Sequence, residues 1–156
     1  MGMGDYPTID KKGNTVWVLT KDTLASAHKH SRKRYRASAI IIRDGKLLLV
    51  QHKGERNFSL PGGGFHHKET TIQAGIREAT REELGGINVL SANRMKHYDM
   101  ESAKTKHKFV LLTISGEPYI KQSREINKVI WWDMKSLLPV HGHVKHILGE
   151  LNGAIK

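Results

Sequence analysis

The sequence contains no cysteine, so it forms no disulfide and has no thiol to serve as a nucleophile or a metal ligand. It also has no apolar run close to the roughly 20 residues that a bilayer-spanning helix needs. Its longest apolar stretches, residues 39–42 and 46–50, are the length of strands. The first residues show no signal-peptide pattern. We therefore expect a cytoplasmic protein with no membrane partner.

Acidic residues are few beside basic ones: 15 Asp and Glu against 26 Lys and Arg, a formal net charge of +11. Such a surplus favours anionic partners, among them nucleotides and nucleic acids. The densest basic cluster is residues 29–36, KHSRKRYR. From the sequence this cluster is a nucleic-acid contact, a phosphate clamp or a solvated linker, and the three interpretations stay open.

The 156 residues suffice for one domain with a hydrophobic core. We predict an N-terminal extension over residues 1–35, with a short strand at 15–19 and a short helix at 22–28, and the main domain over residues 36–156. In the main domain the patterns predict strands at 36–43, 46–51, 87–93, 106–115 and 129–132, helices at 70–84 and 140–151, and a loop at 57–64. Strands on both sides of a central helix predict an α/β protein with a mixed β-sheet between helices.

One segment concentrates the carboxylates that could carry chemistry. Between Gly63 and Gly85 the chain reads GGFHHKETTIQAGIREATREELG: a glycine turn, a lone glutamate, then a helix that carries Arg77, Glu78, Glu82 and Glu83. Carboxylates next to a glycine turn suit hard divalent cations, which proteins use to handle phosphates. The plainer interpretation is a solvated acidic face whose carboxylates pair with arginines of the same helix.

The apolar residues of this segment do not keep to one face of a regular α-helix. At about 100° per residue, the apolar face is formed by Ile72, Ile76 and Ala79. A regular helix would then place Glu83 in the core and Leu84 away from it, which is costly for an unpaired carboxylate. One residue looped out between positions 79 and 82 returns Leu84 to the core and puts all three glutamates on the polar side. We therefore predict a π-type turn in this helix.

The same segment resembles the signature of the Nudix (MutT-like) hydrolases, G-x5-E-x7-R-E-U-x-E-E-x-G-U, in which U is bulky and aliphatic. Positions that match at the family's spacing are Gly63, Glu69, Arg77 and Glu78, and those that match after one inserted residue are Glu82, Glu83 and Gly85. The preceding LPGGG, residues 60–64, is also typical of that family. The resemblance covers about residues 36–133.

The resemblance implies an α/β/α sandwich and hydrolysis of a pyrophosphate bond in a nucleoside diphosphate linked to a group X, with Mg²⁺ or Mn²⁺. By it, Glu78, Glu82 and Glu83 hold the metal with the main-chain carbonyl of Gly62. Arg77 orients Glu78, and Glu69 braces the junction of loop and helix. Glu125 stands where some members place a further metal-binding or base-like glutamate. The implied partner is a nucleotide-type small molecule, and a homodimer stays open.

Two other functions stay open. The basic surplus motivates removal of the 5′ end group of RNA, and the inserted residue in the signature motivates a catalytically weak nucleotide- or RNA-binding module. Candidate rings for stacking on a base are Phe58, Tyr98 and one of the adjacent tryptophans at 131 and 132, which point to opposite sides of a strand. We expect His141, His143 and His146 to be structural surface residues rather than a metal cluster.

Overall fold

The computed structural model describes residues 6–9, 12–13, 15–18, 34–121 and 123–155. The chain divides into two compact units, residues 1–33 and residues 34–156. In the first unit, β1 (Tyr6–Ile9) pairs antiparallel with β2 (Thr15–Val18). The helix expected at 22–28 and most of the basic cluster lie outside the described residues. No helix within the described part is long and apolar enough to cross a membrane.

The main sheet of the second unit combines parallel and antiparallel strands. Its order is β6 (Gly62–Gly64), β3 (Arg34–Ile40), β10 (Thr105–Ser115) and β8 (Asn88–Arg94), and β9 (Met100–Glu101) also pairs with β10. β3 and β10 run parallel, and the other neighbours run antiparallel. The predicted mixed sheet is therefore confirmed.

A second sheet has the order β12 (Ile126–Trp132), β5 (Lys46–His52) and β4 (Ile42–Arg43). Asp44 and Gly45, both with positive φ (52° and 73°), form the predicted tight turn between β4 and β5. A short antiparallel pair, β7 (Leu84–Gly85) with β11 (Tyr119–Ile120), follows the central helix.

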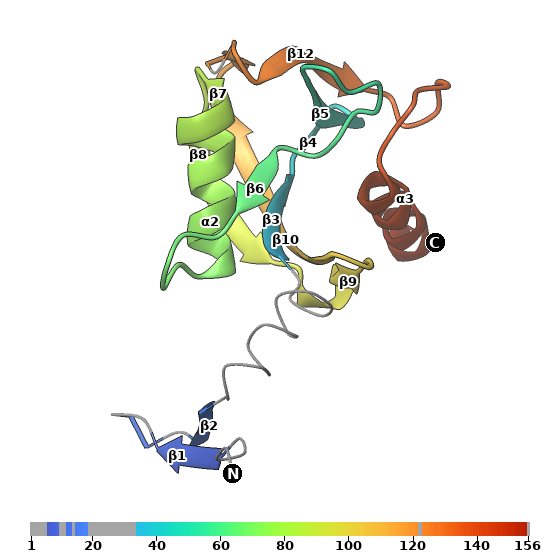
Figure 1. Ribbon diagram of the computed structural model, residues 1–156. Helices are drawn as coiled ribbons and strands as arrows, with labels where there is room; N and C mark the ends of the chain where they lie inside the picture. The colour runs from blue at the N-terminus through green and yellow to red at the C-terminus, as the bar shows by residue number, and fades with distance from the viewer. Residues whose placement is uncertain (1–5, 10–11, 14, 19–33, 122, 156) are drawn as a thin grey trace. The chain divides into compact units, whose positions relative to one another are not determined.

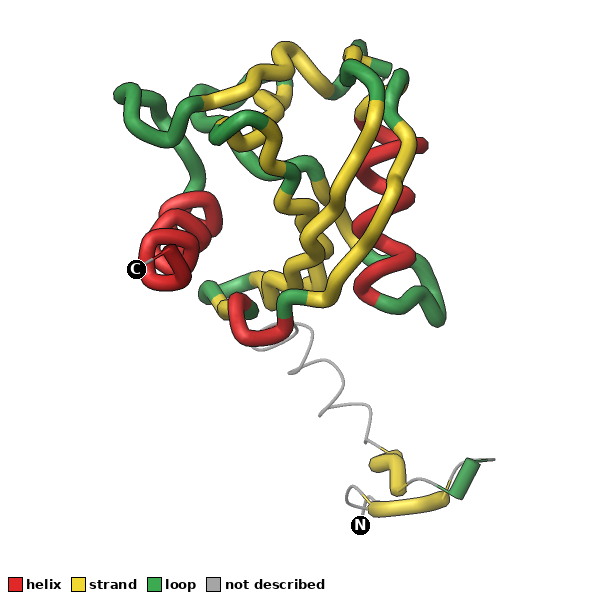
Figure 2. Tube along the Cα trace, turned by 180° about the vertical axis from the view of Figure 1, so that it is seen from behind, coloured by secondary structure: helices red, strands yellow, loops and turns green. Residues whose placement is uncertain are grey.

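Helices cover both sides of the main sheet. The central helix, α2 (Thr71–Arg77) continued by the π-helix η1 (Glu78–Glu83), lies on one side, and α3 (Gly142–Ile155) lies on the other (Figures 1 and 2). A short 3₁₀ turn, η2 (Lys96–Tyr98), precedes β9. Successive residues of β3 point to opposite sides of the sheet and belong to separate hydrophobic cores. Ala39 packs on the α2 side, and Ile40 packs with Val144 of α3. These three layers are the predicted α/β/α sandwich.

The prediction of a loop at 57–64 was wrong for its last three residues. Gly62–Gly64 forms strand β6, which pairs with β3 and has Gly62 opposite Ser38. Because glycine has a low strand propensity, the sequence pattern did not predict this strand. A side chain at position 62 would collide with the carbonyl oxygen of Ala37, so glycine is what allows this close pairing. The predicted strand 36–43 is also split at Ile41.

Candidate active site

The central helix widens where the phase argument predicted. Thr70 caps it in a reciprocal capping box with Gln73, and regular α-helix runs to Arg77. Residues 78–83 then form a π-helix. The hydroxyl of Thr80 donates to the carbonyl of Ile76 at 2.7 Å, and Leu84 is fully buried in the core. The predicted π-type turn is therefore confirmed.

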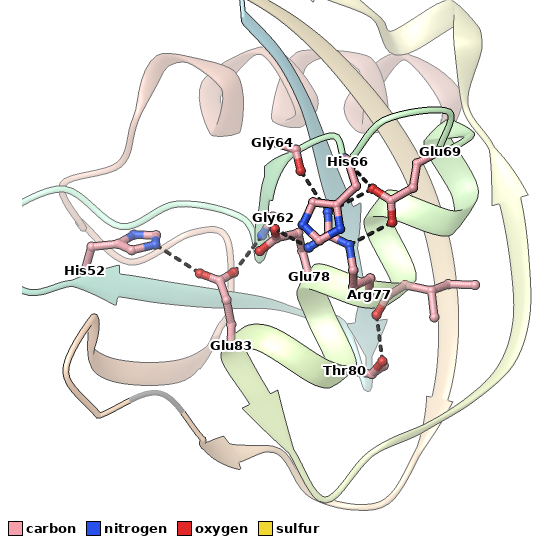
Figure 3. Close-up of polar contacts among 10 residues, drawn as sticks. His52, Gly62, Gly64, His66, Glu69, Arg77, Glu78, Thr80 and Glu83 are labelled. Carbon is pink, nitrogen blue, oxygen red and sulfur yellow. Dashed lines mark hydrogen bonds and ion pairs between the residues drawn. The ribbon is translucent and has the colours of Figure 1, made fainter.

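Glu83 is buried, with only 3% of it exposed, which does not fit the plainer interpretation of a solvated acidic face. Its Oε1 accepts the backbone N–H of Gly62 at 2.7 Å, and its Oε2 lies 3.0 Å from Nε2 of His52 (Figure 3). This hydrogen bond raises the pKa of the His52 imidazole. The burial is tolerated because both carboxylate oxygens have partners.

Arg77 ties the helix to the glycine-rich segment (Figure 3). Its guanidinium donates twice to Glu69, from Nε at 2.7 Å and from Nη2 at 2.9 Å, once to the carbonyl of Gly64 at 2.8 Å, and from Nη1 to Oε1 of Glu78 at 2.8 Å. Glu69 also accepts the backbone N–H of His66 at 2.6 Å. Hydrogen bonding to Arg77 lowers the pKa of Glu69 to about 2. A fixed, permanently charged fork thus sets where the carboxylate of Glu78 lies.

Gly63 allows the carboxylate of Glu78 to lie directly against strand β6. A Cβ at position 63 would stand 2.5 Å from Cδ of Glu78 and 2.6 Å from each of its oxygens. At Gly64, by contrast, the nearest atom, the carbonyl oxygen of Tyr35, would be 4.0 Å away. Only one glycine of this run is therefore tied to the position of the carboxylate.

The glycine strand and the side chains of Glu78 and Glu83 line one cavity of about 320 Å³. Four of the residues predicted for the site line it: Gly62, Glu78, Glu83 and Glu125. Arg77 supports Glu78 through its guanidinium. Glu82 belongs to η1, and its side chain lies outside the described residues.

The oxygen donors on this cavity are of the kind that Mg²⁺ and Mn²⁺ prefer. Glu78 and Glu83 supply carboxylates from successive turns of the widened helix, and Glu125 adds a third to the same lining. Among the described side chains, no three acidic or histidine groups are gathered closely enough to enclose an ion by themselves. The donor set therefore fits a hard cation that keeps some of its waters or takes ligands from a bound phosphate.

Two further residues that line the cavity were not predicted as site residues. His52, at the end of β5, holds Glu83, and Arg36, on β3, donates from Nη2 to the carbonyl of Leu60 at 2.8 Å. His52 comes from a strand with no motif around it, whereas Arg36 ends the basic cluster 29–36, for which a phosphate clamp was one of the open interpretations. Only the tertiary fold brings both to the glutamates.

Several side-chain predictions were wrong. Phe58 and Tyr98, predicted as base-stacking candidates, are 6% and 4% exposed and pack in the core beside α3. His143, predicted on the surface, is buried. The adjacent tryptophans do point to opposite sides of β12, as predicted: Trp132 belongs to the core beside α3, and Trp131 packs against the other core, with the guanidinium of Arg43 5.0 Å from its ring centroid. No sequence pattern identified which of these rings α3 and the neighbouring strands cover.

Known proteins share both this sequence pattern and this fold. Residues 32–148 match the NUDIX domain family. An uncharacterized Nudix hydrolase of Yersinia pestis is 25% identical over 131 residues, which are 79% of this chain and 69% of that protein. The crystal structure of a MutT NUDIX hydrolase from Burkholderia pseudomallei superposes with a TM-score of 0.65 at 25% identity, over 78% of this chain and 99% of that one.

An ADP-ribose pyrophosphatase from Streptococcus suis shares the fold alone, with a TM-score of 0.56 at 19% identity over 79% of this chain and 92% of that one. Because the family match extends over most of the chain, the protein belongs to the NUDIX family. The carboxylate-lined cavity lies beside the widened helix, in a fold shared with a MutT NUDIX hydrolase.

Proposed function

We propose that this protein hydrolyses a pyrophosphate bond in a nucleoside diphosphate linked to a second group X, with Mg²⁺ or Mn²⁺. The observation that carries the proposal is the cavity on the widened helix, where Glu78, Glu83 and Glu125 face a glycine strand. Membership of a hydrolase family supports it. If the glutamates only formed a solvated face of the helix, Glu83 would be exposed, but only 3% of it is. This argues against the interpretation of the helix as a solvated acidic face.

In this proposal Glu78, Glu82 and Glu83 hold the metal, with the main-chain carbonyl of Gly62. When bound, the ion would neutralise phosphate oxygens and lower the pKa of a water. Glu125 lines the same cavity and is the candidate to accept the proton of the attacking water.

The neighbouring residues hold this machinery in place. Arg77 fixes Glu78 while it is itself fixed by Glu69, and His52 and the Gly62 N–H hold the two oxygens of Glu83. Arg36 lines the cavity and offers a guanidinium to a phosphate oxygen. Pre-oriented groups of this kind need no rearrangement when charge develops on the phosphate.

The test is a hydrolysis screen with the full chain and Mg²⁺ over nucleotide sugars, ADP-ribose, dinucleoside polyphosphates, nucleoside triphosphates and capped or triphosphorylated RNA, with products identified. At least one substrate should be cleaved at a pyrophosphate bond. Glu78→Gln and Glu83→Gln should each lose about a hundredfold or more in kcat, because a neutral amide is a poor ligand for a hard cation.

Glu117→Gln is the matched control, because Glu117 is exposed and pairs with Arg43 outside this cavity. Full activity in both site variants, or no cleavage of any substrate under any metal, would overturn the proposed function.

An RNA 5′ end is a second candidate substrate, favoured by a basic and aromatic patch beside the cavity. Tyr35 lines the cavity, is 48% exposed, and has the ammonium groups of Lys106 and Lys108 at 5.5 and 6.0 Å from its ring centroid. Cations and a ring together suit a single-stranded nucleic acid. Turnover of triphosphorylated RNA should then fall steeply with salt, and salt-insensitive turnover would count against RNA.

A further inference from the structure

A second cavity, of about 270 Å³, adjoins the carboxylate-lined one. Arg36, His52 and Thr105 line both cavities, so a ligand held in the first can extend into the second. The second cavity is otherwise lined by Glu55, Ser59 and three histidines, and we call it the histidine cavity. None of the residues predicted for catalysis lines it.

Two polar atoms in the lining of the histidine cavity are buried and lack partners. Ser59 is 3% exposed, and its hydroxyl has no hydrogen-bond partner among the described residues. Nδ1 of His107 is likewise buried and without a partner in that part of the chain. A buried polar atom without a hydrogen-bond partner is costly for a folded protein. Two such atoms on one cavity therefore indicate a ligand that supplies their hydrogen-bond partners.

Beside Arg36, His52 and the carboxylate of Glu55, the histidine cavity is lined by histidine rings that already have partners. Nε2 of His143 accepts the N–H of Leu60 at 3.3 Å, and its ring stacks on His107 with centroids 5.3 Å apart. Burial lowers the pKa of His143 to about 2 and lowers that of His107, so both rings are neutral at pH 7. Glu55 lies 2.9 Å from Nε2 of His141. The cavity therefore offers mixed donors and acceptors rather than a cationic cluster.

This mixture matches hydroxyl groups best. A hydroxyl both donates and accepts, so neighbouring hydroxyls can serve Ser59 and His107 whichever tautomer the ring adopts. A phosphate would lie beside the carboxylate of Glu55, which repels its negative charge, whereas a sugar hydroxyl can donate to that carboxylate. A nucleobase would stack on an aromatic face, but both faces of His143 are already covered by the stacked rings of His107 and His141.

We propose that the histidine cavity binds the group X, that X is a hydroxyl-rich sugar, and that Ser59 and His107 recognise it. The proposal rests on the proposed function, because the diphosphate in the first cavity is what aims X into the second. The sugar hydroxyls then bond to Ser59 Oγ and His107 Nδ1, two atoms that the catalytic groups do not use.

The test measures binding in EDTA, where no metal-dependent turnover consumes the ligand. The full chain is titrated calorimetrically with ADP-ribose and UDP-glucose, and with ADP and UDP as the matched ligands without the sugar. In the unaltered protein the sugar should tighten binding about tenfold or more, and Ser59→Ala or His107→Leu should remove most of that gain. Ser91→Ala, at an exposed serine of β8, is the control and should keep the gain.

Folding and rescue distinguish recognition from a structural role. Because the Ser59 hydroxyl has no partner in the free protein, Ser59→Ala should leave the melting temperature unchanged or raise it. His107→Asn, which keeps a polar atom near the position of Nδ1, should regain part of the binding lost in His107→Leu. For any cleaved sugar nucleotide, Ser59→Ala should raise KM with little change in kcat.

The inference is overturned if neither sugar tightens binding, or if Ser59→Ala and His107→Leu both keep the gain. Tighter binding of a nucleoside triphosphate than of either sugar nucleotide would assign the cavity to phosphate and overturn it as well. If sugar-dependent binding is found but no pyrophosphate bond is cleaved with any metal, the proposed function fails while the recognition of the sugar stands.

Discussion

Arg77 is the residue on which the geometry of the site depends most. Its guanidinium reaches Glu69, the Gly64 carbonyl and Glu78 from one planar group. The hydrogen bond to Glu69 is the main reason that the pKa of Arg77 is raised, so the guanidinium carries its charge at every working pH. A point charge on a flexible stem could not make these contacts together.

Arg77→Lys should therefore keep the fold and lose activity. We expect kcat to fall about ten- to a hundredfold with a smaller change in KM, because the lysine keeps the charge but cannot hold Glu78 and Glu69 together. Steady-state kinetics on the cleaved substrate measure this. Unchanged kcat would show that Glu78 does not need this support.

Glu69 should make the unfolding free energy of the protein decrease at acidic pH. Its pKa is lowered in the folded protein to about 2 from 4.5, so its contribution is complete above pH 4.5 and is lost as the pH falls toward 2. Urea unfolding of the protein and of Glu69→Gln across this range measures it. The stability gap between the two should be constant above pH 4.5 and shrink below it, and a gap that does not depend on pH would contradict the assignment.

At the scale of the element, the glycine strand and the widened helix form one unit. β6 presses against β3, and the helix presents Glu78 to Gly63 and Glu83 to the N–H of Gly62. The π-turn lets Leu84 reach the core while Glu83 reaches the cavity. Strand and helix thus place the two carboxylates together.

Gly63→Ala should displace Glu78 because the new methyl would stand 2.5 Å from its carboxylate carbon. We expect a loss of kcat of about tenfold or more with the fold retained. Gly64→Ala, where the nearest atom is 4.0 Å away, is the matched control and should be nearly silent. Equal kinetics in the two variants would contradict the role of Gly63.

Deleting or inserting a residue in η1 tests whether its extra residue is what directs Leu84 into the core. Deletion of Thr80 should convert the π-turn to regular helix while Glu83 and Leu84 keep their faces, so that the protein stays folded and active. Insertion of an alanine after Thr80 should turn Leu84 out of the core, at a cost of about 2–5 kcal/mol in unfolding free energy. Chemical denaturation and activity measure both variants. A deletion more damaging than the insertion would contradict the phase argument.

At the scale of the whole molecule, periodicity and motif spacing predicted most of the architecture. The conflict between Glu83 and Leu84 predicted the π-turn because two local preferences could not both be met by a regular helix. The signature residues that the structure brings to the cavity were also predictable, since they lie close together in the chain.

What the sequence did not predict depends on contacts between distant strands. Arg36, His52 and His107 meet only because β3, β5 and β10 converge beside the glycine strand, and no spacing encodes that. The burial of Phe58 and Tyr98 depends on the packing of α3. Such positions carry no local signal because their environment is made by segments far away in the chain.

Titration with Mn²⁺, followed by electron paramagnetic resonance of the free ion, measures whether the carboxylates of the widened helix bind a divalent metal. We expect the protein to take up Mn²⁺, with an affinity that falls about tenfold or more in Glu78→Gln and in Glu83→Gln but stays unchanged in Glu117→Gln, because even outer-shell changes cost metal sites that much. No uptake of Mn²⁺, or equal affinity in all the variants, would contradict it.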